Sequence, residues 1–278
     1  MSRLLNRELG VRTASGVVFV AVMAGGILWS PYSLLVLMLV VGAGCLFEFY
    51  RLAGLRGVEA QLGYGQFLGL AAVGLGFSVA MGTIGPVWLL ALVPAAFVVF
   101  AAELYRDRPT PIENIAVTLA GVLYTAAPLA LLFPLGIEAR GDLILYRPLV
   151  VLCLVALVWT NDVGAYLVGS LVGRHKLFER ISPKKSWEGF AGGVVIAMGV
   201  ALLMGRWLGG SPAAWCGLGA VVAVAGVLGD LAESLFKRSV GVKDSGRMMP
   251  GHGGFLDRFD ALLVAAPFAV CYCIVFGI

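Results

Sequence analysis

Charged residues are scarce in this sequence. Only 13% of the 278 residues are Asp, Glu, Lys or Arg, whereas 60% are Ala, Val, Ile, Leu, Met, Phe, Trp, Tyr or Cys. Soluble domains carry roughly 25% charged residues, because a water-facing surface requires them. The mean hydropathy of +0.95 agrees with this shortage. The composition therefore excludes a disordered chain and a soluble enzyme, and it indicates a polytopic membrane protein.

Metal-binding and disulfide patterns of cysteine and histidine are also lacking. The chain has two histidines and five cysteines, and no two cysteines form a CxxC pair. Buried cysteines in apolar runs usually act as small hydrophobic side chains. We therefore expect neither a disulfide framework nor a zinc site from Cys45, Cys153, Cys216, Cys271 and Cys273.

Long apolar runs are what the sequence has in abundance. A helical span needs about 20 residues, and the runs are continuous rather than alternating, which is not typical of a membrane β-barrel. The first run has a basic flank but no small-residue cleavage site, so we expect an uncleaved first span. The nine predicted segments are 14–30, 32–53, 62–82, 84–104, 113–136, 147–172, 189–207, 211–236 and 260–278.

The distribution of Lys and Arg predicts the orientation of these spans. With nine spans and a cytoplasmic N-terminus, 17 of the 20 basic residues fall inside, and only Arg140, Arg147 and Arg206 fall outside. Cytoplasmic loops carry an excess of Lys and Arg. The sequence therefore predicts an all-α polytopic membrane protein with nine transmembrane helices, its N-terminus in the cytoplasm and its C-terminus outside.

Polar residues are concentrated in the second half of the chain. Residues 1–145 read as transmembrane scaffold helices, and residues 146–278 as a catalytic region with cytoplasmic loops at 173–188 and 237–259. An inverted-repeat transporter is expected to show corresponding broken helices in both halves. This pattern therefore favours a single polar site in the second half.

Asp162 is an ionisable residue inside the sixth apolar run. It follows Pro148 by 14 residues, which is about 21 Å along a helix and places it in the cytoplasmic part of the span. A carboxyl group costs several kcal/mol there unless it faces a polar cavity or a partner. Asp162 is therefore a candidate site residue, and the alternative is a structural contact through Asn161 or Tyr166.

The segment 173–193 combines an interruption of regular secondary structure, two adjacent lysines and the start of a helix. Ser182 precedes a proline, Lys184 and Lys185 precede a new helix, and Ser186 can cap that helix. Free N–H groups at a helix N-terminus bind anions, and adjacent lysines favour them further. The segment thus indicates a site for lipid or nucleotide phosphate. Ordinary cytoplasmic positive charge with a helix cap is the alternative.

A second polar face lies near the end of the eighth run. Asp230, Glu233, Ser234 and Lys237 are spaced i, i+3, i+4 and i+7, so they share one face of a helix. We expect this face at the cytoplasmic membrane boundary.

Two further acids follow a glycine-containing turn. The glycines of 243–254 allow a ligand to approach the backbone closely, and Asp257 and Asp260 lie one helical turn apart. Hard oxygen ligands beside basic residues suit a Mg²⁺–polyphosphate complex. Asp230, Glu233, Asp257 and Asp260 can then all converge at the cytoplasmic membrane boundary. The alternative is a salt-bridge cluster of these two acids with Arg258 and Arg238.

The segment 234–260 resembles the signature of the phosphatidate cytidylyltransferases, the CDP-diacylglycerol synthases. The family pattern is S-x-apolar-K-R, four residues, K-D, a P-x-H-G-G turn and D-R-apolar-D. Residues 159–193 also resemble the family's upstream block, W-x-x-D-x-x-A-Y followed by S-P-x-K-T-x-E-G-x-x-G-G. Two residues depart from these patterns. Met249 stands where the family usually has Ile, Leu or Phe, and Ser186 stands where it usually has Thr. The signature matches are Ser234, Lys237, Arg238, Lys243, Asp244, Pro250, His252, Gly253, Gly254, Asp257, Arg258 and Asp260.

The resemblance implies an integral membrane enzyme of phospholipid biosynthesis. It would transfer the cytidylyl group of CTP to phosphatidic acid, giving CDP-diacylglycerol and pyrophosphate, with Mg²⁺ as cofactor. A second cation and a homodimer are left open, and no nucleic-acid partner is expected. We expect the enzyme in a bacterial inner membrane, with its active site facing the cytoplasm.

The resemblance also implies roles for individual residues. The expected metal ligands are Asp230 and Asp257, with Glu233, Asp260 and Asp162 as further ligands. The expected catalytic residues are Asp230, Asp257, Asp260, Lys237 and His252, where His252 would protonate or orient pyrophosphate or only brace the turn. The expected substrate contacts are Ser182, Lys184, Lys185, Ser186, Ser234, Arg238, Lys243, Asp244, Gly253, Gly254 and Arg258.

Two other functions are compatible with parts of the pattern. A CTP-dependent polyprenol or phytol kinase would transfer the γ-phosphoryl group and release CDP. An ion-coupled transporter would use the intramembrane acids as a relay, but it predicts acids near the bilayer midplane and leaves the basic glycine loop unexplained.

Overall fold

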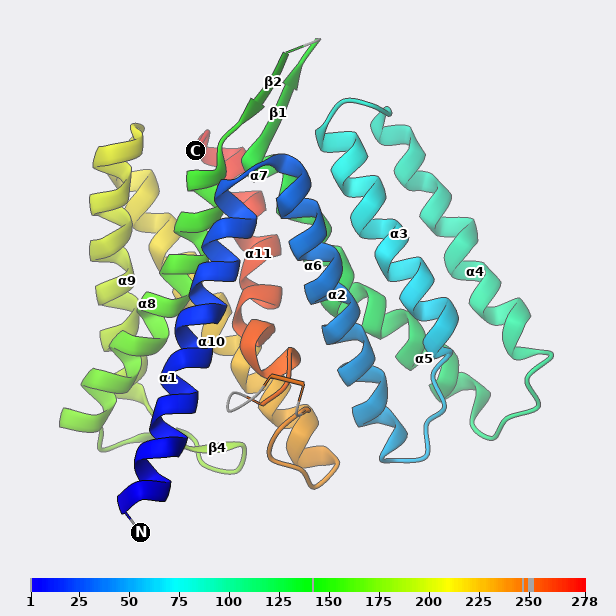
Figure 1. The fold of residues 1–278 in the computed structure, drawn as a ribbon, viewed down its shortest axis with the longest axis horizontal. Helices are drawn as coiled ribbons and strands as arrows, with labels where there is room; N and C mark the ends of the chain where they lie inside the picture. The colour runs from blue at the N-terminus through cyan, green and yellow to red at the C-terminus, as the bar shows by residue number, and fades with distance from the viewer. Residues whose placement is uncertain (1, 142, 247, 250–252) are drawn as a thin grey trace. The chain divides into compact units, whose positions relative to one another are not determined.

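The chain divides into two compact units that are described separately. The computed structural model describes residues 2–141, 143–246, 248–249 and 253–278, with side chains from residue 13 onward (Figure 1). The first unit comprises Met1–Pro148 and Val240–Phe259, and the second comprises Leu149–Ser239 and Asp260–Ile278. Each unit is therefore built from two separate stretches of sequence.

The first unit consists of helices and one short hairpin. Figure 1 shows α2, α3 and α4 side by side. The 3-10 helix η1 continues directly into α4, and the π-helical turn η2 joins α5 to α6. The elements are α1 (Ser2–Leu28), α2 (Pro31–Gly54), α3 (Leu62–Ala80), η1 (Pro86–Ala91), α4 (Leu92–Glu103), α5 (Pro111–Gly121), η2 (Val122–Ala126), α6 (Ala127–Leu131), α7 (Phe133–Gly136), β1 (Ile137–Arg140) and β2 (Leu143–Tyr146).

Prolines mark where several helices begin. Pro31, Pro86 and Pro111 each stand in the first turn of a helix, where the missing N–H costs nothing and the fixed φ suits the helix. At α2 the cap is complete, because the Ser30 side chain accepts from the Ser33 backbone N–H at 3.0 Å and Ser33 Oγ accepts from the Ser30 backbone N–H at 2.9 Å. These signals place the predicted boundaries near the observed ones.

A buried polar network ties three helices of the first unit together. The carboxylate of Glu103 on α4 accepts from Asn114 Nδ2 at 2.8 Å, from Gln61 Nε2 at 2.7 Å and from Arg106 Nη1 at 2.8 Å. Gln61, Glu103 and Asn114 are buried. Buried polar groups require such partners, since an unsatisfied one costs free energy. The network therefore stabilises the ends of these helices.

A short antiparallel hairpin, β1–β2, ends the continuous part of the first unit. Ile137 pairs with Tyr146 across it, and the Tyr146 hydroxyl donates to the carbonyl of Ile27 on α1. Burial raises the pKa of Tyr146 to about 12, so the hydroxyl remains a donor at neutral pH. The sequence did not predict this hairpin, because four-residue strands are too short to show a clear period of two.

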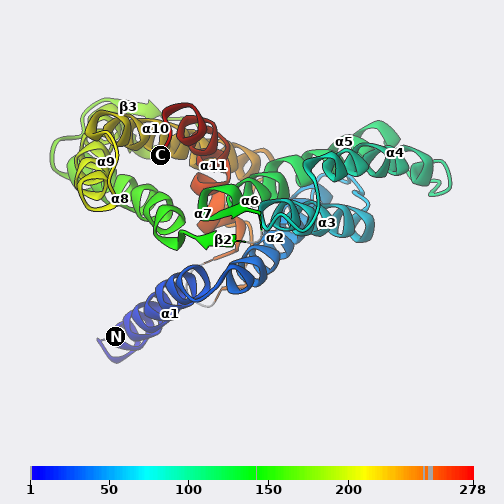
Figure 2. The ribbon, with the colours of Figure 1, turned by 90° about the horizontal axis from the view of Figure 1, so that it is seen from above.

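The second unit consists of four helices and a second hairpin. Its helices α9 and α10 pack against each other along their length, as Figure 2 also shows. α11 begins in the first unit and continues in the second from Asp260 onward. The elements are α8 (Pro148–Val172), β3 (Lys176–Phe178), β4 (Ser182–Ser186), α9 (Trp187–Leu208), α10 (Pro212–Ser239) and α11 (Leu256–Phe276).

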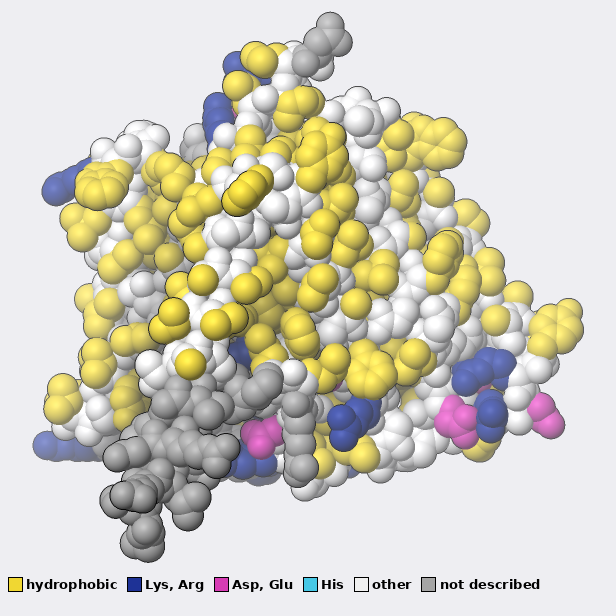
Figure 3. All heavy atoms as spheres, in the orientation of Figure 1, with side chains coloured by type: hydrophobic (Ala, Val, Ile, Leu, Met, Phe, Trp, Pro, Cys, Tyr) yellow, Lys and Arg dark blue, Asp and Glu magenta, His cyan; other side chains and the backbone are white. Residues whose placement is uncertain are grey.

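Apolar helices dominate both units, as the composition predicts. Among the described residues, eight helical stretches are long and apolar enough to cross a membrane, and Thr13–Leu28 forms a shorter apolar helix. Many large hydrophobic side chains are exposed, such as Val40 on α2 and Phe67 on α3. In Figure 3 hydrophobic side chains cover much of the face that α2 and α3 present. This is an integral membrane protein, and the ninth span and the orientation remain predictions.

The two units of the structure can be compared with the predicted division of the chain after residue 145. The first break, at Pro148, lies close to the predicted one after residue 145. The segment Val240–Phe259, which includes the glycine-containing turn, belongs to the first unit together with the N-terminal helices. The predicted division into scaffold and catalytic region concerns function and remains a prediction.

Candidate active site

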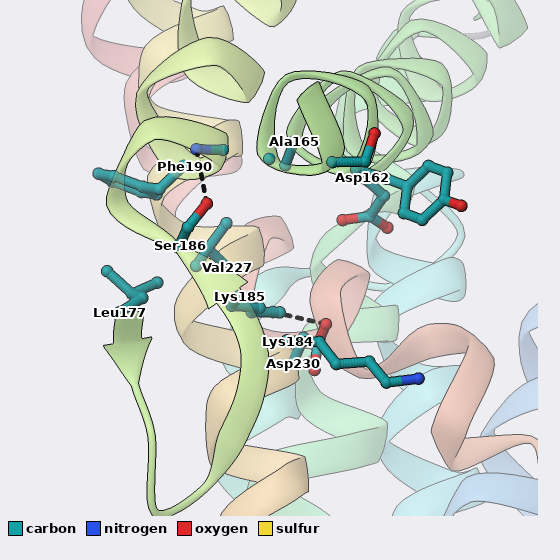
Figure 4. Close-up of a pocket in the computed structure, with 13 residues that line it drawn as sticks. Asp162, Ala165, Leu177, Lys184, Lys185, Ser186, Phe190, Val227 and Asp230 are labelled. Carbon is teal, nitrogen blue, oxygen red and sulfur yellow. Dashed lines mark hydrogen bonds and ion pairs between the residues drawn. The ribbon is translucent and has the colours of Figure 1, made fainter. Parts of the chain in front are cut away.

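The second unit contains a cavity that combines acids, lysines and apolar side chains. Its volume is about 400 Å³, and α8, the β3–β4 hairpin, α9 and α10 all contribute to its wall. Figure 4 shows the charged side chains around it. The lining residues are Asp162, Ala165, Tyr166, Gly169, Ser170, Leu177, Lys184, Lys185, Ser186, Gly189, Phe190, Val227 and Asp230.

Two carboxylates predicted from the sequence line this cavity from different helices. Asp162 lies on α8 and Asp230 on α10. Lys185 Nζ lies 2.6 Å from Asp230 Oδ2, and the dashed line in Figure 4 marks this pair. Both partners keep part of their surface, since their side chains are 26% and 33% exposed. The cavity therefore presents fixed positive and negative groups to a ligand.

The β3–β4 hairpin carries both lysines to the cavity. Lys176 pairs with Ser186 and Phe178 with Ser182 across the two strands. Lys184 and Lys185 lie on β4, and both line the cavity (Figure 4). The sequence predicted an interruption of regular structure at Ser182, and in the structure strand β4 begins at this residue.

Ser186 is the N-cap of α9, as predicted. Its side chain accepts from the Gly189 backbone N–H at 3.1 Å and caps the helix. Gly189 is also required by close packing, because a Cβ there would lie 2.7 Å from the carbonyl oxygen of Ala165 on α8. This approach brings the start of α9 against the helix that carries Asp162.

We expect Ser186→Ala to destabilise the second unit by about 1 kcal/mol, the usual cost of losing a side-chain N-cap. Ser186→Thr keeps the hydroxyl acceptor and matches the residue the family usually has here. Its free energy of unfolding should therefore stay within about 0.5 kcal/mol of the wild-type value. Thermal unfolding of both purified variants in the same detergent measures the difference. Equal melting temperatures for the alanine and threonine variants would contradict the capping role.

The predicted polar face of α10 is confirmed as a set of contacts. Ser234 Oγ donates to Asp230 Oδ1 at 3.2 Å, and Lys237 Nζ forms an ion pair with Glu233 Oε2. Glu233 is fully buried and Lys237 nearly so. Ser234 thus helps to orient a cavity carboxylate, whereas the Glu233–Lys237 pair is enclosed by the protein.

Two more predicted residues belong to the second unit. Asp260 on α11 is 9% exposed, and its Oδ1 accepts from the Ala261 backbone N–H at 2.7 Å. A Cβ at Gly229 would lie 2.5 Å from the carbonyl oxygen of Asp260, so α11 and α10 are in close contact here. Arg238 is exposed in the last turn of α10.

Asp257 is placed in the first unit, at the start of α11. Its carboxylate accepts from the Ser245 backbone N–H at 3.0 Å and from the Gly254 N–H at 2.9 Å. Gly253 forms an isolated bridge with Met249, and its φ of +83° favours glycine. The acid thus organises the turn that the sequence singled out.

The structure describes three of the four remaining residues predicted for this turn. Lys243, Asp244 and Arg258 are exposed. The predicted catalytic His252 lies outside the described residues. Their predicted roles remain predictions.

Sequence reasoning missed a buried acid in the first unit. Glu48 on α2 is 0% exposed, and its Oε2 accepts from Ser245 Oγ at 2.9 Å and from the Leu256 backbone N–H at 2.9 Å. The signal that singled out Asp162, an ionisable residue within an apolar run, applies equally to Glu48.

No group of three or more His, Cys, Asp or Glu side chains within the described residues is arranged to hold a metal ion. Magnesium, however, is often bound through one or two carboxylates together with substrate phosphates. Asp162 and Asp230 provide two carboxylates to one cavity. Their oxygen chemistry therefore fits a magnesium ion that arrives with a phosphate ligand.

The chain belongs to the cytidylyltransferase family, since residues 10–276 match the model of that family. With its apolar helices, it is a membrane-embedded enzyme of this class. The curated relatives carry a more particular name, phosphatidate cytidylyltransferase. One from Staphylococcus aureus (strain COL) is 36% identical over 204 residues, covering 71% of this chain and 75% of the relative. One from Mycobacterium leprae (strain TN) is 48% identical over 118 residues, covering 42% and 38%.

Proposed function

We propose that this enzyme transfers the cytidylyl group of CTP to phosphatidic acid, giving CDP-diacylglycerol and pyrophosphate, as a step of phospholipid biosynthesis. The observation that carries the proposal is the cavity of the second unit, where Lys184 and Lys185 stand with Asp162 and Asp230. Two phosphate-bearing substrates require such cations. The names of the relatives support the same reaction.

The reaction needs no protein nucleophile. An oxygen of the phosphatidate phosphate attacks the α-phosphorus of CTP, and the bond from that phosphorus to the β-phosphate oxygen breaks. The leaving group is pyrophosphate, which carries away the electron pair. Because the reactants are all anionic, catalysis depends on positioning and on neutralising charge.

The lysines of β4 are proposed to neutralise phosphate charge. Lys185 lies beside Asp230, so its ammonium group is held in a defined position, while Lys184 is exposed on the same strand. A positioned cation stabilises developing negative charge more than a mobile one, because it needs no reorganisation during the reaction. Ser186 and Gly189 line the same cavity, so the positive end of the α9 helix dipole lies close to the proposed phosphates.

Magnesium is proposed as the cofactor, and it would neutralise negative charge on the reacting phosphates. Asp230 is the first candidate ligand, and Asp162 shares its cavity. Asp257 and Asp260 stay in the proposed ligand set, as does Glu233, although Glu233 is buried against Lys237. A second cation is left open.

The other predicted contacts complete the proposal. Arg238, Lys243 and Arg258 are exposed basic residues, and they would bind the phosphates of CTP or the leaving pyrophosphate together with Lys237. Ser182, Ser234, Asp244, Gly253 and Gly254 would bind substrate, and His252 would protonate or orient pyrophosphate.

Apolar residues of the cavity suit a lipid substrate. Tyr166 is 75% exposed, and Leu177 and Phe190 line the cavity beside the charged groups. The acyl chains would remain in the bilayer while the phosphate enters. The excess of Lys and Arg in the predicted inside segments supports an active site that faces the cytoplasm, and the bacterial relatives support an inner-membrane location.

A product assay with two labels tests the proposal. The purified protein is given phosphatidic acid, Mg²⁺ and CTP labelled on either the α- or the γ-phosphate. We expect the α-label in the lipid extract and the γ-label in released pyrophosphate. Transfer of the γ-label to a polyprenol or phytol, with release of CDP, would overturn the proposal in favour of a kinase. Ion flux in proteoliposomes without nucleotide, together with no lipid label, would favour a transporter.

A further inference from the structure

Glu48 links the second helix of the chain to the glycine turn near its end. It lies on α2, and its side chain is fully enclosed. Its hydrogen-bond partners, Ser245 and Leu256, come 197 and 208 residues later. All three belong to the first unit.

The surroundings of Glu48 are shaped for this contact. A Cβ at Gly246 would lie 2.1 Å from Glu48 Oε1, and one at Gly254 would lie 2.2 Å from Glu48 Oε2. One turn earlier on α2, a Cβ at Gly44 would lie 2.6 Å from the ring of Phe255. The backbone of the turn therefore passes directly against the Glu48 carboxylate, and a side chain at Gly246 or Gly254 would displace that carboxylate from its present position.

Ser245 connects Glu48 to a predicted site residue. Its hydroxyl donates to Glu48 Oε2, while its backbone N–H donates to both carboxylate oxygens of Asp257, at 3.2 and 3.0 Å. The Leu256 N–H, which also donates to Glu48, is at the first residue of α11. One buried carboxylate therefore holds the helix start and the residue that orients Asp257.

We propose that Glu48 is a positioning residue for the reaction, acting through Ser245 and Leu256 on Asp257. This inference rests on the proposed function, in which Asp257 serves the reacting phosphates. Two donors share one acceptor oxygen of Glu48, so its removal frees both at once. Asp257 would then keep its own bonds to a turn that is no longer anchored.

The test compares Glu48 with a matched buried acid. Glu103 is also buried in the first unit and also accepts several hydrogen bonds, but its described partners lie outside the glycine turn. For Glu48→Leu we expect kcat per folded molecule to fall about 30-fold, within the range for residues that orient ligands. For Glu103→Leu we expect lower thermal stability with kcat per folded molecule within about 2-fold of wild type.

Conservative variants separate positioning from a general loss of structure. Glu48→Gln keeps an acceptor oxygen of the same reach, so it should recover kcat to within about 5-fold of wild type. Ser245→Ala should lower kcat by itself but add little to Glu48→Leu, because contacting residues act non-additively. Fully additive effects, or Glu48→Leu with unchanged kcat per folded molecule, would overturn the proposal.

Hydrogen exchange provides a measurement that does not depend on activity. We expect the Leu256 amide to exchange about 10-fold faster in Glu48→Leu, because it loses its acceptor, whereas Glu103→Leu should leave it unchanged. If the wild-type protein forms no CDP-lipid, the proposed function fails, and exchange alone then decides whether Glu48 holds the turn. Unchanged exchange at Leu256 would overturn the positioning role whatever the activity.

Discussion

Asp230→Asn is expected to lower kcat for CDP-lipid formation about 100-fold or more, a loss typical of removing a main electrostatic group from an active site. The carboxylate lines the cavity, is paired with Lys185 at 2.6 Å and accepts from Ser234 at 3.2 Å. Asparagine has nearly the same shape but no charge. The loss corresponds to about 2.7 kcal/mol in the activation barrier. Initial rates at saturating CTP and phosphatidic acid measure it.

The same variant also tests the metal proposal. If Asp230 holds Mg²⁺, the concentration of Mg²⁺ needed for half-maximal activity should rise in Asp230→Asn. Glu179→Gln is the matched control, because Glu179 is an exposed acid of the β3–β4 segment that does not line the cavity. Full activity with an unchanged Mg²⁺ response in Asp230→Asn would contradict its assigned role.

Lys185→Met is expected to lower kcat/KM about 50-fold, because it removes a positioned cation from a site where all reactants are anions. It also removes the cationic partner of Asp230, so the negative charge of that carboxylate is no longer compensated where phosphate should bind. The methionine keeps most of the apolar length of lysine. Two-substrate kinetics measures the effect separately for CTP and for phosphatidic acid, and so assigns the lysine to one of them.

The control for Lys185 lies on the other strand of its hairpin. Lys176 on β3 is exposed and does not line the cavity, so Lys176→Met should stay within about 2-fold of wild type. Lys185→Arg keeps the positive charge and should fall between the two methionine variants. Equal kinetics for Lys185→Met and Lys176→Met would show that position on the cavity wall is irrelevant.

Continuous apolar runs in the sequence predicted where most of the helices lie. Each predicted apolar segment contains a helix, because a continuous apolar run in a membrane chain has few other backbone solutions. Helices α2 and α5 begin at Pro31 and Pro111, close to the starts of the predicted segments 32–53 and 113–136. The hairpin β1–β2 was missed, since its register depends on pairing rather than on a local pattern.

Short-range spacing also predicted part of the site. Ser234 contacts Asp230, and Lys237 contacts Glu233, at the helical interval i, i+4, which is the interval that brings side chains together on a helix. Spacing alone does not distinguish an open site from an enclosed pair. Only the structure shows that Asp230 lines a cavity while Glu233 is fully buried.

Long-range contacts cannot be predicted from spacing along the chain. The family resemblance alone implied a common site for Asp162 and Asp230, which line the same cavity although 68 positions separate them in the chain. The contact between Glu48 and Ser245 spans 197 positions. No periodicity encodes such pairs, because they arise from how helices pack rather than from how one helix is built.

The contact of Glu48 also has a consequence for biosynthesis. At about 5–20 residues per second, a ribosome needs roughly 10–40 s between making Glu48 and making its partners near the end of the chain. Throughout that interval the second helix is already synthesised, but its acid lacks the groups that satisfy it in the mature protein. The first unit therefore finishes folding only when residues 240–259 have emerged. Nascent chains cut short before that point would keep an acid without these partners within a membrane helix, where an unpaired ionisable group is costly.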